Sequence, residues 1–274
     1  MDAFHKMFTE DSKDYPWDEN ALEDFKKLII ENKIKCKMDD MFLLGFLRVM
    51  KFDVEGSLQL LRNYYSTRLE YPAYFKNLLP SKLEKALSSN CMKVLPQPDQ
   101  NGRFICIGQL GHWNPSEVPL IDIYRVTFLL ADLLFTLHQC QENGIVLILD
   151  TKNSTFKQLM EYTPKFIHNI VSLLSNDCNQ LFIKEMHYVN LNFIVKGLLK
   201  LSLPLFPAKL RNKIFPHSDM ASLHEFIHPE FLPVEYGGEL PDFDMSEYFE
   251  VVKQNEEFYV NNEEFVKNYN EAVQ

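Results

Sequence analysis

A continuous apolar run, Ile145–Leu149, constrains the fold of this 274-residue chain more than any other feature. Gly144 precedes the run and Asp150 follows it, which is typical of a strand buried on both faces. The surrounding pattern predicts strands at Arg103–Gln109, Leu181–Val189 and Lys213–Pro216, and helices at Glu117–Gln141, Phe156–Leu174 and Phe193–Leu203. Because strands and helices alternate, we expect the C-terminal two thirds to be α/β with a largely parallel sheet.

The first third of the chain has a purely helical pattern. Residues 18–79 repeat apolar side chains at helical spacing. Asp39 and Asp40 are placed to cap a second helix, and Asp53 a third that ends before Pro72. A short helix at Lys82–Ser88 and a turn cluster at residues 96–102 are expected before the first strand.

Charge is distributed unevenly. The formal net charge is −10, with −6 in residues 1–24 and −7 in residues 241–274. An acidic total of this size argues against a general nucleic-acid binder. The acidic segment 241–274 either packs as a helix or stays loose, and we expect a helix. The middle of the chain contains a basic block with one acid, Glu185, among six basic residues: Lys184, Lys196, Lys200, Lys209, Arg211 and Lys213.

Several classes of protein are disfavoured. The five cysteines are scattered without a CxxC pair, which favours reduced thiols in a cytoplasmic protein. The polar N-terminus does not resemble a signal peptide, and no apolar run reaches 18 residues, so we expect a soluble chain. No nucleophile elbow, Walker loop or dinucleotide-binding glycine motif is found.

Two groups suggest catalysis. His224-Glu225-Phe226-Ile227-His228 matches the zinc-hydrolase pattern H-E-x-x-H, with Glu247 or Glu250 as a third ligand. Pro229 disfavours that geometry, because a residue before proline is pushed out of the helical region. Asp150 lies at a strand end, where α/β proteins place active sites, although such a residue more often caps a loop.

The segment Asn192–Phe206 is predicted to be an interruptible helix. Phe193, Ile194, Leu198 and Leu201 form an apolar stripe beside Lys196 and Lys200. The stripe fits either an ordinary core helix or an apolar lid over a pocket or lipid surface. Gly197 and Pro204 suit a hinge.

The motifs taken together resemble the CRAL-TRIO lipid-transfer family, in particular its tocopherol- and retinaldehyde-carrying subgroup. The resemblance is collinear from about residue 18 to 240. It rests on residues 42–55, Asn63-Tyr-Tyr with Arg68, Asn101-Gly-Arg103, Leu110-Gly-His-Trp-Asn-Pro115, residues 143–150, Thr163-Pro164, His187-Tyr-Val-Asn190, residues 206–214 and Leu232-Pro-Val-Glu-Tyr-Gly-Gly238.

The resemblance implies a helical domain at 1–88, a lipid-binding α/β domain at 89–240 and the acidic tail 241–274. A deep apolar pocket would be closed by a mobile gate helix at 192–206, whose inner face would cover the ligand when closed and contact membrane when open. Tyr124 and Thr127 would be the polar anchors. The implied pocket residues are Tyr124, Thr127, Ala131, Ile145, Ile170, Leu173, Leu174, Met186 and Tyr188, with Phe193, Ile194, Leu198 and Leu201 on the gate.

The resemblance further implies a monomeric cytoplasmic carrier that acts peripherally at membranes, with a bound lipid, no cofactor and no catalysis. The ligand would be a tocopherol-, retinoid- or similar isoprenoid-like lipid. The alternatives are an adaptor that keeps the fold without transferring lipid, and the zinc hydrolase. Phosphoinositide contact is implied by basic residues at Lys184, Lys209, Arg211 and Lys213, whereas Met50 and Phe182 replace basic residues of the family pattern.

Overall fold

The computed structural model describes residues 7, 15, 17–175, 183–241 and 245–273. A five-stranded sheet in the order β1-β2-β3-β4-β5 forms its centre. β1 pairs antiparallel with β2, and every other pair is parallel, so the predicted α/β fold class is confirmed. The strands are β1 (Met92–Val94), β2 (Phe104–Gln109), β3 (Ile145–Asp150), β4 (Ile183–Val189) and β5 (Ile214–Pro216).

The N-terminal helices form a core of their own. Asp39 and Asp53 cap α3 and α4, as predicted, by accepting hydrogen bonds from the backbone N–H groups of Phe42 and Gly56. Interlocking aromatic rings, with Phe46 edge-on to Tyr64, fill the space between the helices. The helices are α2 (Glu19–Glu31), α3 (Asp40–Val49), α4 (Val54–Glu70), α5 (Pro72–Phe75) and α6 (Glu84–Leu87).

Helices predicted as continuous are split in the structure. The first breaks at Phe135–Leu137, where the Thr136 hydroxyl donates to the Leu133 carbonyl oxygen, and the second breaks before Pro164. No described helix is long and apolar enough to cross a bilayer. The helices after β2 are α7 (Leu120–Leu134), α8 (His138–Asn143), α9 (Phe156–Met160), α10 (Pro164–Ser175), α11 (Phe193–Ser202), α12 (Ala208–Arg211) and α13 (Met220–His224).

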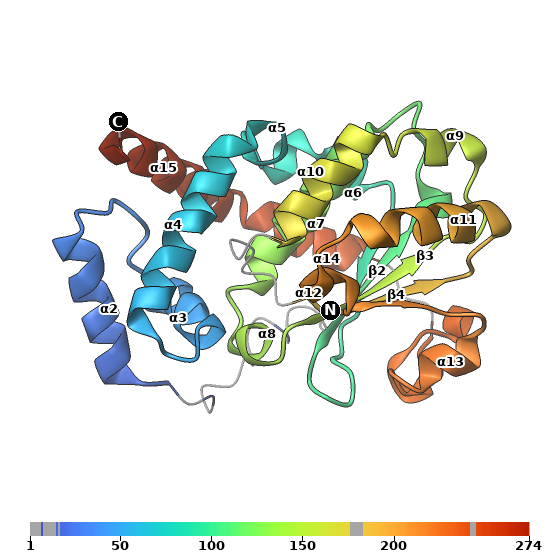
Figure 1. The fold of residues 1–274 in the computed structure, drawn as a ribbon, viewed down its shortest axis with the longest axis horizontal. Coiled ribbons are helices and arrows are strands. Elements are labelled where there is room, and N and C mark those ends of the chain that lie inside the picture. The colour runs from blue at the N-terminus through green and yellow to red at the C-terminus, as the bar shows by residue number, and fades with distance from the viewer. Residues whose placement is uncertain (1–6, 8–14, 16, 176–182, 242–244, 274) are drawn as a thin grey trace.

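The sheet has two differently packed faces (Figure 1). One face packs against α13 and the loops after it, and there Val146 and Ile148 of β3 are fully buried. The opposite face is covered by α7, α10 and α11. The side chains of β3 alternate between these faces, as expected for a strand covered on both sides.

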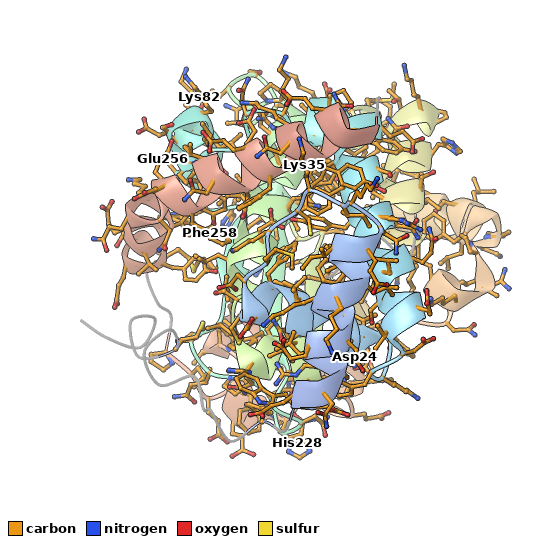
Figure 2. All side chains as sticks on the ribbon, turned by 90° about the vertical axis from the view of Figure 1, so that its left-hand side faces the viewer. Asp24, Lys35, Lys82, His228, Glu256 and Phe258 are labelled. Carbon is orange, nitrogen blue, oxygen red and sulfur yellow. The ribbon has the colours of Figure 1, made fainter. Side chains whose placement is uncertain are left out.

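The acidic C-terminal segment returns to the N-terminal helices as α14 (Ser246–Gln254) and α15 (Glu256–Val273). Glu256 lies beside Lys82 at the start of α15 (Figure 2) and accepts a hydrogen bond from the Ser81 backbone N–H. Further along α15, Tyr269 stacks on Tyr65 at 4.9 Å between ring centroids. The segment therefore packs against the N-terminal helical part of the chain, at Ser81 and at α4.

A buried ion pair joins the N-terminal helices to the α/β part. Arg68 of α4 donates to Asp132 of α7 at 2.6 Å, and both side chains are almost fully buried. The Arg68 guanidinium also lies over the rings of Tyr64 and Phe75. A buried charge that has lost its partner costs several kcal/mol, so this contact fixes where α7 lies relative to α4.

A buried histidine pair joins β4 to the chain after β5. His187 Nδ1 lies 2.9 Å from His217 Nε2, and His187 Nε2 lies 3.2 Å from a Glu185 carboxylate oxygen. Burial lowers the pKa of His187 to about 4, although Glu185 opposes the shift. Burial also lowers the pKa of His217. Both rings therefore favour the neutral form in the folded protein.

We expect the folded state to lose stability as the pH falls from about 6.5 through about 4. The unfolded His187 side chain takes up a proton near pH 6.5, whereas the folded one resists it down to about 4, so acid favours unfolding. Protonation of His187 should lower the free energy of unfolding by about 2 kcal/mol between pH 7 and pH 4.5. Urea unfolding at several pH values measures the loss.

The matched comparison is His187→Gln against His228→Gln, since His228 is exposed. The His187→Gln protein should show a flatter pH profile, while His228→Gln should follow the unmodified chain. Equal slopes for all three proteins would show that His187 does not carry the pH dependence.

Candidate functional site

The candidate site lies on the side of the sheet covered by α7, α10 and α11. Leu147 and Leu149 of the central strand point to this side and are only half-buried, although Val146 and Ile148 on the other side are fully buried. A central strand flanked by strands and covered by helices retains accessible surface only where packing is incomplete. Leu147 and Leu149 therefore keep accessible surface on this side, and we call the region that they border the chamber.

The residues expected to line a pocket fall into two groups. One group is buried within the surrounding core: Ala131, Ile145, Ile170, Leu173 and Met186. The other keeps partial exposure: Tyr124, Thr127, Leu174 and Tyr188. The structure brings Tyr124 and Leu174 together with the core cluster of α7 and α10, and Tyr188 with the cluster of β4 and β5. Contact with a ligand remains a prediction for each residue.

Aromatic rings gather at one end of the chamber. Phe166 of α10 lies 5.0 Å from the Tyr124 ring and 5.9 Å from the Tyr162 ring. Burial is the main cause of the raised pKa of Tyr124, Tyr162 and Tyr188, so all three hydroxyls stay protonated at neutral pH. The Thr127 hydroxyl donates to the Ile123 carbonyl oxygen at 3.2 Å, so its proton is not available to a ligand while that hydrogen bond is made.

The expected inner face of α11 is corrected by the structure. Phe193 is 90% exposed and Leu201 76%, and Ile194 and Leu198 are each 47% exposed. Val195 and Leu199 instead point inward and are buried. The helix is apolar around most of its circumference, so its stripe did not reveal which side faces the protein. In this conformation the predicted gate residues lie on the surface.

A second exposed apolar pair, missed by the sequence analysis, lies on α9. Phe156 and Met160 are 66% and 62% exposed. The loop before α9 touches the start of α11, because the Asn192 amide donates to the Ser154 hydroxyl at 3.2 Å. Figure 1 shows α9 above α11 at the same edge of the molecule. Phe156 and Met160 are four residues apart and so lie on one side of this short helix, and that spacing was the signal in the sequence.

The basic residues lie around β4, α12 and β5. Lys209 and Arg211 are exposed on α12, whereas Lys184 and Lys213 are half-buried. Burial lowers the pKa of Lys184 and of Lys213, and the Lys213 ammonium donates to the Ile183 carbonyl oxygen at 2.6 Å. Lys213 thus has a structural contact. Met50 packs against the N-terminal core, and Phe182 lies outside the described residues.

The zinc-hydrolase alternative is contradicted by the local geometry. α13 ends at His224, so His224 and His228 do not share a helix. His224 Nε2 lies 2.8 Å from the Tyr236 carbonyl oxygen, and His228 is exposed. No cluster of three metal-binding side chains occurs among the residues that the structure describes.

Asp150 hydrogen-bonds to the segments that follow β3 and β4 and to Tyr236. Its carboxylate accepts hydrogen bonds from Asn190 at 2.8 Å, from the Lys152 backbone N–H at 2.8 Å and from the Tyr236 hydroxyl at 3.1 Å. These contacts agree with the loop-capping interpretation.

Comparisons with known proteins place the chain in a family. A model of the CRAL/TRIO domain matches residues 89–238. Human alpha-tocopherol transfer protein-like is 34% identical over 244 residues, which cover 89% of this chain and 71% of the relative. Rat Clavesin-1 is 34% identical over 212 residues, covering 76% of this chain and 60% of the relative. The chain belongs to the CRAL/TRIO domain family.

A solved structure agrees at the level of the fold. The crystal structure of Sfh5 superposes with a TM-score of 0.51 at 15% identity, covering 89% of this chain and 99% of that chain. Similarity at this identity concerns the architecture alone. It extends over most of the α/β part and of the helices that flank it.

Proposed function

We propose that this protein binds a small hydrophobic lipid in the chamber and transfers it between membranes, without catalysis and without a cofactor. The half-buried state of Leu147 and Leu149, beside the fully buried Val146 and Ile148 of the same central strand, carries the proposal. Family membership and a relative named alpha-tocopherol transfer protein-like support it. An isoprenoid-like ligand suits a chamber walled by leucines and aromatic rings.

The proposal requires selectivity beyond hydrophobicity. A lipid that buries about 500 Å² of apolar surface gains roughly 12 kcal/mol relative to water. A bilayer offers the same lipid a similar gain, so apolar burial alone does not extract it. The shape of the chamber and a few hydrogen bonds must tip the balance.

We expect an organic extract of the purified protein to contain one lipid class at close to one molecule per chain. Mass spectrometry of the extract, before and after incubation of the protein with phospholipid vesicles, measures how much lipid is bound and how much is released. An empty protein that also takes up no lipid from vesicles would favour the adaptor alternative and contradict the carrier.

The outward face of α11 supplies a membrane-docking surface. Phe193, Leu198 and Leu201 project from the molecule, with Lys196 and Lys200 along one side. Apolar side chains flanked by lysines suit an interface with anionic lipid. The exposed pair on α9 extends the same surface. Insertion of α11 would favour an open chamber to the extent that the bilayer binds the open state better.

The double variant Leu198→Asp/Leu201→Asp should lower partition onto phosphatidylcholine vesicles at least 10-fold, because two inserting side chains become charged. Co-sedimentation measures partition, and a two-vesicle assay measures transfer of the lipid recovered by extraction. Both positions are exposed, so the fold should be retained.

Ile30→Asp provides the control, since Ile30 is 67% exposed on α2. That variant should partition and transfer like the unmodified chain. Unchanged transfer by the double variant would contradict docking through α11.

The exposed basic residues of α12 provide a second membrane contact. Each basic side chain near an anionic surface contributes about 1 kcal/mol. We therefore expect Lys209→Glu/Arg211→Glu to weaken binding to vesicles that contain phosphatidylserine or a phosphoinositide at least 10-fold, while binding to neutral vesicles stays the same.

Lys82→Glu/Lys85→Glu makes the same charge change at exposed positions near α6 and provides the control. Equal losses in both double variants would show a general charge effect. A larger loss on phosphoinositide than on phosphatidylserine vesicles of equal charge would support headgroup recognition.

A further inference from the structure

A pocket separate from the chamber lies between α15 and residues 32–39, the linker that joins α2 to α3. Its volume is about 480 Å³, a size at which proteins bind small molecules. Figure 2 faces this side of the molecule and labels Phe258 on α15 and Lys35 on the linker. The wall presents one basic, three apolar and two amide side chains: Lys37, Met38, Phe258, Phe265, Asn261 and Asn268. None of these residues belongs to the sheet or to the helices that cover the chamber.

Both walls of the pocket are held by one side chain of the N-terminal core, Tyr65. The Lys37 backbone N–H donates to the Tyr65 hydroxyl at 3.1 Å, which fixes the linker. The Tyr269 ring stacks on that of Tyr65 at 4.9 Å, which fixes α15. The pocket is therefore preorganised, so binding loses little free energy to the ordering of its walls.

Lys37 brings an unpaired positive charge to the pocket. Its half-buried ammonium lies 5.0 Å from the centre of the Phe258 ring and 5.6 Å from that of Phe42. Among the residues that the structure describes, this ammonium has no ion pair and no hydrogen bond. Burial lowers the pKa of Lys37, and the charges of Asp39 and Asp132 raise it by less. A half-buried cation beside aromatic rings gains more from an anion than an exposed one does.

The amides of α15 add hydrogen-bonding groups to the same pocket. Asn261 and Asn268 are exposed, and neither side chain makes a hydrogen bond to another described residue. Asn261 lies one helical turn from Phe258, whose ring contacts Lys37, so its amide is on the Lys37 side of the pocket. An amide N–H donates to carboxylate oxygens.

Two acidic residues limit the charge of a ligand. Asp39 and Glu264 line the pocket and are exposed, so water solvates their carboxylates. Together with Lys37 they give the wall a formal charge of −1. A phosphate, which carries a second negative charge, would be repelled more strongly than a carboxylate. A cation would lie against the half-buried ammonium, where water screens the repulsion least.

We propose that this pocket binds a small monocarboxylic acid with an apolar or aromatic body. The carboxylate pairs with Lys37 and accepts a hydrogen bond from the Asn261 amide, and the body packs on Phe258 and Phe265. The site shares no residue with the chamber, so the inference goes beyond lipid transfer and does not depend on it.

Three ligands with one ring system test the class: naphthylacetate, its neutral amide naphthylacetamide, and naphthyl phosphate. Isothermal titration calorimetry with the full chain measures their affinities. The acid should bind about 10-fold more tightly than the amide, because a hydrogen bond between charged groups contributes more than one between neutral groups. It should also bind more tightly than the phosphate, whose second charge is repelled by Asp39 and Glu264.

Substitutions at the pocket test the residues. Lys37→Met removes the charge but keeps an unbranched apolar side chain, and should weaken the acid about 10-fold while leaving the amide unchanged. Lys35→Met is the matched control, since Lys35 is an exposed lysine on the same linker (Figure 2). Asn261→Ala should weaken the acid about 3- to 10-fold without changing a packed position. The acid should raise the melting temperature of the unmodified chain more than that of Lys37→Met.

The contrary results are equally specific. Equal affinity for the acid and the amide would overturn the inference, as would unchanged affinity of the acid for both Lys37→Met and Asn261→Ala, which is the result expected if the acid binds in the chamber. Tighter binding of the phosphate would identify a different ligand class and overturn it too. Failure of all three ligands to bind would also overturn it, and every one of these results would leave the lipid carrier unaffected.

Discussion

The structure depends on the requirement that β3 be covered on both faces. Covering one face is straightforward, because α13 and its following loops bury Val146 and Ile148 completely. On the other face the covering helices leave Leu147 and Leu149 only half-buried, so packing there is incomplete. Incomplete packing at this place is unfavourable, since every missing contact loses dispersion energy. The helices around it must therefore be held in place by contacts elsewhere.

Those contacts come from the N-terminal helices. Arg68 binds Asp132 on α7, and Gly45 of α3 lies so close to the Phe135 ring that a methyl group there would overlap it. Arg48 of α3 donates to the Gln141 side chain at 2.6 Å, so α8 is tied to the same support. Residues 42–55 thus hold α8 and the end of α7 against the N-terminal helices.

Sequence reasoning succeeded where one local signal decided the structure. The apolar run of β3 is too short for a typical helix, so its length favours a strand. Asp39 caps α3 through a local hydrogen bond that does not depend on tertiary packing. It missed β1, which has three residues and forms only because β2 is beside it. For α11, side chains on opposite sides of the helix are equally apolar, so burial of Val195 rather than Phe193 is set by the tertiary structure. The sequence analysis did not predict that the Tyr162 ring would lie beside that of Phe166, because its position follows from the break before Pro164.

The chain around α11 restricts how the chamber can open. Both ends of the segment 190–213 are fixed: the Met186 backbone N–H donates to the Lys213 carbonyl oxygen at 2.7 Å, and that of His217 to the Tyr188 carbonyl oxygen at 2.9 Å. Between these ends, a Cβ added at Gly197 would meet no neighbouring atom. Because these backbone hydrogen bonds hold β4 to the chain after the segment, movement of α11 would leave β4 in place. A lipid bound beside β3 and β4 would keep its contacts with the sheet while α11 moved toward the bilayer. Under the proposed function, the sheet would then select the lipid and α11 would control its release, so a membrane could promote release without weakening the contacts that distinguish one lipid from another.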